Sequence, residues 1–156
     1  MNENVGDTCA AQEDLRDFAF GVNEGVEADV GTDVLQLRWL IYADAERWDA
    51  CLDIAASLTR VAPRCPVNWI YHAQSLWKLG REREAKNLLA SVTDDFNTSS
   101  AIAYHMARFC CELGETQEAF GWLEKAVAAA NGPKELIRLR KQVLEDPVLE
   151  PLRGKL

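Results

Sequence analysis

Two histidines and five cysteines are the residues of this chain best suited to catalysis or to binding a transition metal. His72 and His105 are 33 residues apart, and Cys110 and Cys111 are adjacent. A cysteine nucleophile needs a base beside it, and only His105 lies near the cysteine pair in the sequence. No phosphate-binding loop, serine nucleophile motif or paired metal ligands accompany these residues. We therefore expect no enzyme, no cofactor and no metal site, and we expect His72 to be a hydrogen-bonded core residue.

The spacing of the cysteines also argues against a metal site or a redox pair. No C-x-x-C motif occurs among Cys9, Cys51, Cys65, Cys110 and Cys111. Adjacent helical side chains point about 100° apart, so Cys110 and Cys111 cannot easily bind one metal ion together or form a disulfide with each other. We expect reduced thiols with structural roles, which is typical of cytoplasmic proteins.

Charge is distributed unevenly along the chain. Residues 1–33 contain nine acids and one base, whereas the remaining 123 residues balance 16 acids against 16 bases. A chain of net charge −8 repels phosphate backbones, so we expect no nucleic-acid partner. No apolar stretch reaches the ~20 residues of a membrane span, and the start lacks the regions of a signal peptide. We predict a cytoplasmic protein with no membrane partner.

The first part of the chain, 1–31, is predicted to be an acidic arm with one short helix from Ala11 to about Phe20. Two roles are open for it. The arm solubilises the chain, or it folds back onto a basic groove.

Apolar residues recurring every three or four positions predict a series of helices. Their expected ranges are 33–45, 47–61, 67–79, 82–94, 101–113, 116–130 and 134–145. Thr32 or Asp33 offers a cap for the first of these, and Ser99 or Ser100 for the fifth. The fold class that follows is all-α.

The helices pair into units that repeat every 34 residues. The turn inside each pair falls at Glu46, Gly80 and Gly114, which are 34 residues apart. The same interval separates the two series Cys51, Ala85, Ala119 and Leu58, Val92, Ala126. This period, with paired helices of ~13 residues, is typical of a solenoid. We predict three units over 32–131, with bounds 32–65, 66–99 and 100–131.

The residues at fixed places in each unit resemble the tetratricopeptide repeat family, over about two thirds of the chain. The middle unit supplies Trp69, Ala73, Leu76, Gly80, Ala85, Leu89 and Val92. The third supplies Met106, Ala107, Cys110, Gly114, Ala119, Leu123 and Ala126, and the first supplies Leu35, Tyr42, Trp48, Cys51, Leu58 and Pro63. Departures are Trp39 in a glycine slot, Arg38 and His72 in leucine slots, and Asn97 and Asn131 in place of the closing proline. The resemblance implies a right-handed α-solenoid whose concave groove binds protein segments.

In that family the first helix of each pair lines the groove, which implies a set of partner-binding residues here. They are Gln36, Leu40, Ile70, Gln74, Trp77, Lys78, Tyr104 and Arg108. Aromatic side chains beside a guanidinium are typical of binding hot spots. The family's carboxylate clamp is not expected, because Gln36, Leu40 and Tyr71 stand where its lysine and asparagines would be needed.

The C-terminal part, 132–156, is predicted to cap the array with a helix and a short tail helix. Leu136, Ile137 and Leu139, with Val143 and Leu144, can face inward, while Lys134, Arg138, Arg140 and Lys141 form an exposed cationic face. The function expected from the whole pattern is a non-catalytic scaffold that binds a protein or peptide. Two alternatives remain open: a chaperone similar to the small class that handles secretion translocators, and a self-associating protein or homodimer.

Overall fold

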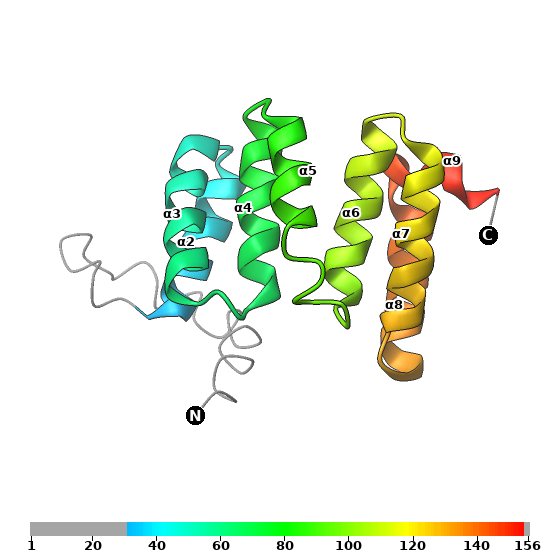
Figure 1. Cartoon of the computed structure of the whole chain (residues 1–156). Helices are drawn as coiled ribbons and strands as arrows, with labels where there is room; N and C mark the ends of the chain where they lie inside the picture. Colours follow the sequence, from blue (N-terminus) through cyan, green and yellow to red (C-terminus); the bar gives the residue numbers. More distant parts are fainter. Residues whose placement is uncertain (1–30, 155–156) are drawn as a thin grey trace. The chain divides into compact units, whose positions relative to one another are not determined.

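The computed structural model describes residues 31–154, and this range folds into helices joined by turns (Figure 1). No strand occurs between residues 31 and 154, so the predicted all-α class is confirmed. The predicted helix at 11–20 lies outside the described residues, as does all of the acidic arm except Gly31. None of the described helices has both the length and the apolar character needed to cross a bilayer.

The helices begin and end close to the predicted positions. Their bounds are α2 Thr32–Asp44, α3 Trp48–Val61, α4 Pro66–Lys78, α5 Glu82–Ala90, α6 Ser100–Glu112, α7 Thr116–Ala129, α8 Gly132–Glu145, η4 Pro147–Leu149 and α9 Glu150–Arg153. Ser99 caps α6 as predicted, since its hydroxyl accepts a hydrogen bond from the Ile102 amide. The predicted caps of α2 are wrong, because Gly31 occupies the N-cap position.

The end of α5 differs most from the prediction. We expected the helix to continue to Asp94, but it ends at Ala90 and residues 91–98 form turns. The hydroxyl of Ser91 donates a hydrogen bond to Leu88 O at 2.6 Å, and that of Thr93 donates to Ala90 O at 2.9 Å. Side chains that bind nearby carbonyls in this way compete with helix continuation.

The turn inside each helix pair has the same backbone geometry in all three 34-residue repeats. Its central residue is left-handed each time, with φ of 57° at Glu46, 84° at Gly80 and 80° at Gly114. The next amide bonds back to a carbonyl five residues earlier: Arg47 to Tyr42 at 2.8 Å, Arg81 to Leu76 at 3.0 Å and Glu115 to Cys110 at 2.8 Å. This is the Schellman arrangement, which satisfies the last carbonyls of the preceding helix. The 34-residue register is therefore present in the backbone.

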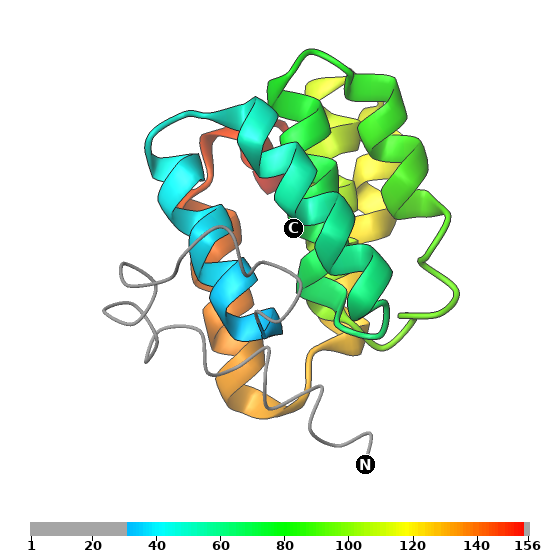
Figure 2. The ribbon, with the colours of Figure 1, turned by 90° about the vertical axis from the view of Figure 1, so that its left-hand side faces the viewer.

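The chain divides into two compact units, residues 1–85 and residues 86–156. From here on, the terms first unit and second unit mean these two parts of the chain and not the 34-residue repeats. In the first unit α3 packs against both α2 and α4 (Figures 1 and 2). The indole of Trp39 stacks on Tyr71 with ring centres 4.0 Å apart, and its Nε1 donates a hydrogen bond of 2.9 Å to Ser75. Trp39 fills a slot that the repeat pattern reserves for glycine. The stacking explains how α2 and α4 accommodate it.

The second unit is built on the packing of α6 against α7, with η4 against α6 and α9 against α7. Its core combines Ala107 and Cys110 of α6 with Leu123 of α7, and it also contains Leu149 and Leu152 of the tail. Both tail leucines are fully buried. The predicted short tail helix is therefore part of the folded core.

The thiols agree only partly with the expectation of reduced cysteines. Cys51, Cys110 and Cys111 are free. Cys65 is disulfide-bonded, so the expectation fails at this position, and the structure describes only this end of the bond.

The apolar side of α8 is broader than its contact with the core. Leu139 and Val143 are buried, as predicted. Leu136, Ile137 and Leu144 were also predicted to face inward, and this is wrong because they are 44%, 67% and 49% exposed. The apolar arc of α8 is therefore only partly covered within the chain.

Candidate functional site

His72 takes part in the packing between α3 and α4. Its Nδ1 lies 3.3 Å from the hydroxyl of Thr59, and that hydroxyl donates to the carbonyl of Ala56. The Thr59 hydroxyl thus links the His72 ring of α4 to the backbone of α3. Burial lowers the pKa of His72, which keeps the ring neutral. The contact agrees with the predicted hydrogen-bonded histidine, whereas the side chain is half-buried and not the fully buried one that was expected.

His105 lies in α6 beside Tyr104, with the two ring centres 5.5 Å apart. Its Nδ1 is buried and has no hydrogen-bond partner among residues 31–154. Burial and the nearby charge of Arg108 lower the pKa of His105 to about 4, against the opposing effect of Asp146. The pKa values of the neighbouring thiols shift upward. Burial raises the pKa of Cys110 to about 12 and also raises the pKa of Cys111. These shifts disfavour the thiolate that cysteine catalysis requires.

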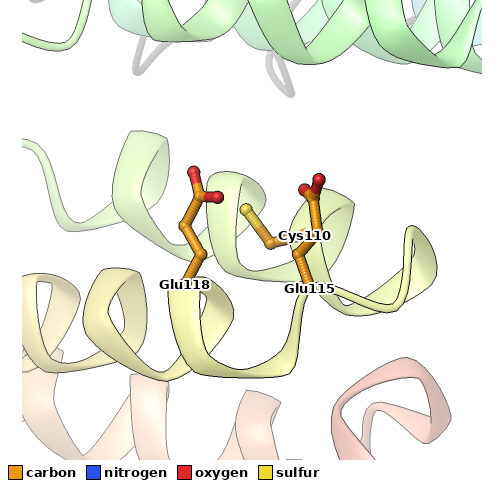
Figure 3. Close-up of side chains that lie close together, drawn as sticks. All are labelled: Cys110, Glu115 and Glu118. Atoms are coloured by element: carbon orange, nitrogen blue, oxygen red, sulfur yellow. The ribbon is translucent and has the colours of Figure 1, made fainter.

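A cluster of potential metal ligands that the sequence spacing did not reveal occurs at the start of α7. The sulfur of Cys110 and carboxylate oxygens of Glu115 and Glu118 lie within 4.8 Å of one another (Figure 3). The ammonium of Lys86 in α5 occupies the same place, 2.7 Å from Glu115 Oε1 and 3.2 Å from Glu118 Oε2.

Lys86 is only 8% exposed, so this ion pair is shielded from water. Burial by itself would lower the pKa of Lys86, but its hydrogen bonds to the two carboxylates raise the pKa above its ordinary value. The cluster thus already holds a cation of its own. Its role within the described residues is to join α5 to α7.

Three of the predicted partner-binding residues are packed inside the first unit. Gln36 is 0% exposed, and its amide donates a hydrogen bond of 2.9 Å to Asn68. Ile70 is buried, and Leu40 packs against the core that contains Trp39. These side chains hold α2, α3 and α4 together and leave little surface for a partner.

Three other predicted residues of the first unit remain accessible on α4. Gln74 and Trp77 are half-buried and Lys78 is exposed. We call these three residues the α4 surface. The ammonium of Lys78 lies 5.7 Å from the centre of the Trp48 ring, which is a cation–π distance. The α4 surface therefore combines an aromatic ring, an amide and a positioned cation.

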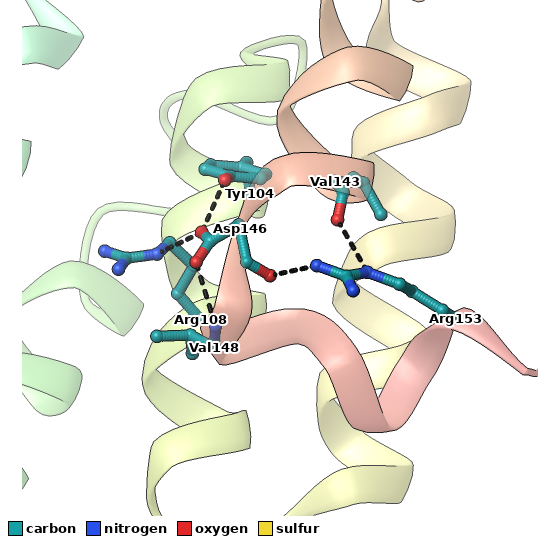
Figure 4. Close-up of polar contacts among 6 residues, drawn as sticks. All are labelled: Tyr104, Arg108, Val143, Asp146, Val148 and Arg153. Atoms are coloured by element: carbon teal, nitrogen blue, oxygen red, sulfur yellow. Dashed lines mark hydrogen bonds and ion pairs between the residues drawn. The ribbon is translucent and has the colours of Figure 1, made fainter.

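The two predicted residues of the second unit bind the chain's own C-terminal segment. The hydroxyl of Tyr104 and the Nε of Arg108 each lie 2.6 Å from Asp146 Oδ2 (Figure 4). The other carboxylate oxygen of Asp146 accepts a hydrogen bond of 3.0 Å from the amide of Val148, and Arg153 donates to the carbonyls of Asp146 and Val143.

The environment of Asp146 stabilises its charged form. Burial alone would raise its pKa, but the hydrogen bonds from Tyr104 and Val148 and the charge of Arg108 lower it overall. Tyr104 and Arg108 are thus engaged within the chain. Whether any of the predicted residues contacts a partner stays a prediction.

An apolar groove on the second unit was not predicted as a site. It is lined by Leu123 and Val127 of α7 and by Leu136, Leu139, Arg140, Val143 and Leu144 of α8, and its volume is about 450 Å³. We call it the α7–α8 groove. The sequence could have indicated this groove, because the apolar residues of α8 cover more of the helix surface than packing against a single core requires.

No family model matches the chain, and no curated protein or solved structure matches it either. The resemblance to the tetratricopeptide repeat family therefore remains a prediction. Its support is the residue pattern together with the recurring turn at Glu46, Gly80 and Gly114.

Proposed function

We propose that this chain is a non-catalytic helical-repeat scaffold of the tetratricopeptide type, and that it binds a segment of a partner protein. The observation that carries the proposal is the α4 surface, where Lys78 is exposed and Trp77 is half-buried beside it. A large ring beside a cation is a common centre of binding energy in protein interfaces.

The state of the reactive groups supports a binding role over a catalytic one. His72 is bonded to Thr59, and the lowered pKa of His105 makes it a weak base at neutral pH. The raised pKa of Cys110 keeps its thiol protonated. Nucleophilic catalysis would need the opposite shifts.

The position of Lys78 favours an acidic or amide-rich partner segment next to an apolar side chain. The cation–π contact with Trp48 restricts the Lys78 side chain, so less conformational entropy is lost when it meets a carboxylate. Trp77 lies next to it in sequence, and Gln74 lies one helical turn before Lys78. A partner segment running along α4 would meet all three.

The proposal is tested by capture from a lysate of the source cells with the tagged full chain. Trp77→Ala with Lys78→Glu should reduce the captured partner about 30-fold, which corresponds to the loss of about 2 kcal/mol from one hot-spot contact. Arg64→Glu serves as a matched control, because Arg64 is also an exposed base of the first unit. Circular dichroism checks that all variants fold.

Arg108 is left unchanged in this experiment. Its ion pair with Asp146 holds the C-terminal segment, so a substitution there would alter the fold. Rescue by Trp77→Phe would show that an aromatic contact is needed at that position. Equal capture by the wild type and the double variant would overturn the assignment of the α4 surface.

A further inference from the structure

The outer side of α8 is unusual for a helix near the end of a helical array. A terminal helix normally presents a polar face to water. Here Leu136, Ile137 and Leu144 are exposed on α8, and Val127 of α7 is 46% exposed. Three of these four side chains line the α7–α8 groove. The groove thus gathers exposed large apolar side chains in one place, which is a mark of an interaction site.

The shape of the groove fits a helix. Leu136, Arg140 and Leu144 are spaced by four residues and therefore form one row along α8. Val127 supplies the facing wall from α7, and the buried Leu139 and Val143 contribute to the lining. A row on one helix beside a row on another makes the kind of channel into which the ridge of a third helix packs.

Positive charge lies within and beside this apolar row. Lys134, Arg138, Arg140 and Lys141 are all exposed, and Arg140 is part of the groove lining. None of the four forms an ion pair within residues 31–154. Glu135 lies close enough to Arg138 for its charge to be felt, but the Glu135 carboxylate is hydrogen-bonded to the Ser100 hydroxyl and the Asn131 amide and forms no ion pair with the four bases.

We propose that the α7–α8 groove binds an amphipathic helix of another protein, with apolar side chains facing Leu136 and Leu144 and carboxylates facing Arg140 and Lys141. Burial of Leu136, Leu144 and Val127 supplies the hydrophobic contribution to affinity. The unpaired cations select for acidic flanks and reject basic ones. The groove contains none of the residues of the α4 surface, so the proposal does not depend on the proposed function.

A second copy of this chain is the less favoured occupant. A two-fold axis through the middle of the row from Leu136 to Leu144 would pass next to Arg140, and would bring Arg140 and Lys141 of one copy close to the same residues of the other. Like charges placed together in an interface are costly. The charge pattern therefore points to a different, acidic partner.

The test uses two synthetic fluorescein-labelled helical peptides and the full chain. Both peptides carry the same leucine stripe over about 18 residues, with glutamates on the flanks of one and lysines on the flanks of the other. Fluorescence anisotropy at low salt should show saturable binding of the glutamate peptide and at least about 10-fold weaker binding of the lysine peptide. Added salt should reduce the difference.

Three variants make the test specific. Leu136→Glu with Leu144→Glu should abolish binding, and both positions are exposed enough for the fold to survive. Arg140→Glu with Lys141→Glu should reverse the preference so that the lysine peptide binds more tightly. Arg64→Glu, which changes an exposed base of the first unit, should leave both affinities unchanged.

The proposal is overturned by any of three results. The first is no binding of the glutamate peptide, and the second is equal affinity for the two peptides. The third is a wild-type dimer in sedimentation velocity that the Leu136→Glu, Leu144→Glu variant converts to a monomer, because a second copy would then fill the groove. Trp77→Ala with Lys78→Glu should not alter peptide binding here, so failure of one proposal is distinguishable from failure of the other.

Discussion

Arg108 and Asp146 are 38 residues apart in the chain, and the guanidinium Nε of the first lies 2.6 Å from the carboxylate of the second. The contact joins the middle of α6 to the residue that follows α8. Tyr104 adds its hydroxyl to the same oxygen. Two side chains that the repeat pattern assigns to partner binding thus hold the C-terminal segment in place.

The Arg108–Asp146 contact should contribute measurably to stability. Arg108→Ala should reduce the free energy of unfolding by about 2 kcal/mol, because charge-assisted hydrogen bonds of partly buried groups contribute on that order. Asp146→Ala should cost more, because it also removes the acceptor of the Val148 amide. Urea denaturation of both single variants and the double variant measures the coupling. Strictly additive effects would show that the contact is not energetically important.

The lowered pKa of His105 predicts a loss of stability in weak acid. Its pKa of about 4 in the folded chain lies below the ordinary value of 6.5, so the unfolded state binds a proton first as the pH falls. The contribution of His105 is therefore fully present above pH 6.5 and is lost as the pH falls through 4, with a slope of at most about 1.4 kcal/mol per pH unit. His72 should contribute in the same direction.

The variant His105→Gln isolates this effect. It should flatten the pH dependence of the free energy of unfolding between pH 6.5 and 4, measured by urea denaturation at each pH. Arg108, Tyr104 and Asp146 surround the ring and remain in the variant. An unchanged slope would mean that folding does not lower the pKa of His105.

Substitutions at the three left-handed turn positions should change the stability of the chain with different signs at the glycines and at Glu46. Gly80→Ala and Gly114→Ala should each destabilise the chain by about 1 kcal/mol, because a Cβ at these positions meets no neighbour and the cost comes from the backbone alone. Glu46→Gly should stabilise it by about 0.5 kcal/mol, since relief of the left-handed strain exceeds the added freedom of the unfolded chain. Thermal denaturation distinguishes the signs. Stabilisation by both alanine variants would contradict the backbone geometry.

Lys86 should be required for the Cys110, Glu115 and Glu118 cluster to remain stable. Lys86→Ala should cost about 2 kcal/mol because it removes the ammonium that lies between the carboxylates of Glu115 and Glu118. Replacing the group together by Lys86→Met, Glu115→Gln and Glu118→Gln should restore most of that loss. Guanidinium denaturation measures both variants. If the single and triple variants are equally unstable, packing accounts for the role of Lys86 and charge does not.

Local features of the fold were largely predictable from the sequence. The helix ends follow from apolar periodicity and from caps such as Ser99, and the repeated turns follow from the spacing of Gly80 and Gly114. Each of these signals depends on residues close to one another in the chain. The end of α5 was not predicted because the apolar periodicity continues past Ala90. The hydroxyls of Ser91 and Thr93 donate hydrogen bonds to backbone carbonyls there.

Features of the site that depend on distant residues were not predictable. Nothing in the sequence pairs Arg108 with Asp146, or Lys86 with Glu115, across 38 and 29 residues. The exposure of Leu136 and Leu144 was also missed, because periodicity gives the apolar arc of α8 but not which part of it a neighbour covers. The resemblance to the repeat family predicted that Gln36 lines the groove. Its side chain is instead buried and donates a hydrogen bond to Asn68.

The central claim, that the α4 surface contacts a partner protein, is tested most directly by site-specific photocrosslinking in the source cells. A benzophenone amino acid replaces Lys78 in one variant and Arg60, an exposed residue of α3, in another. The account predicts a discrete crosslinked protein from position 78 that is absent from position 60 and that weakens when Trp77→Ala is added. The same crosslinked products from both positions, unaffected by Trp77→Ala, would contradict it.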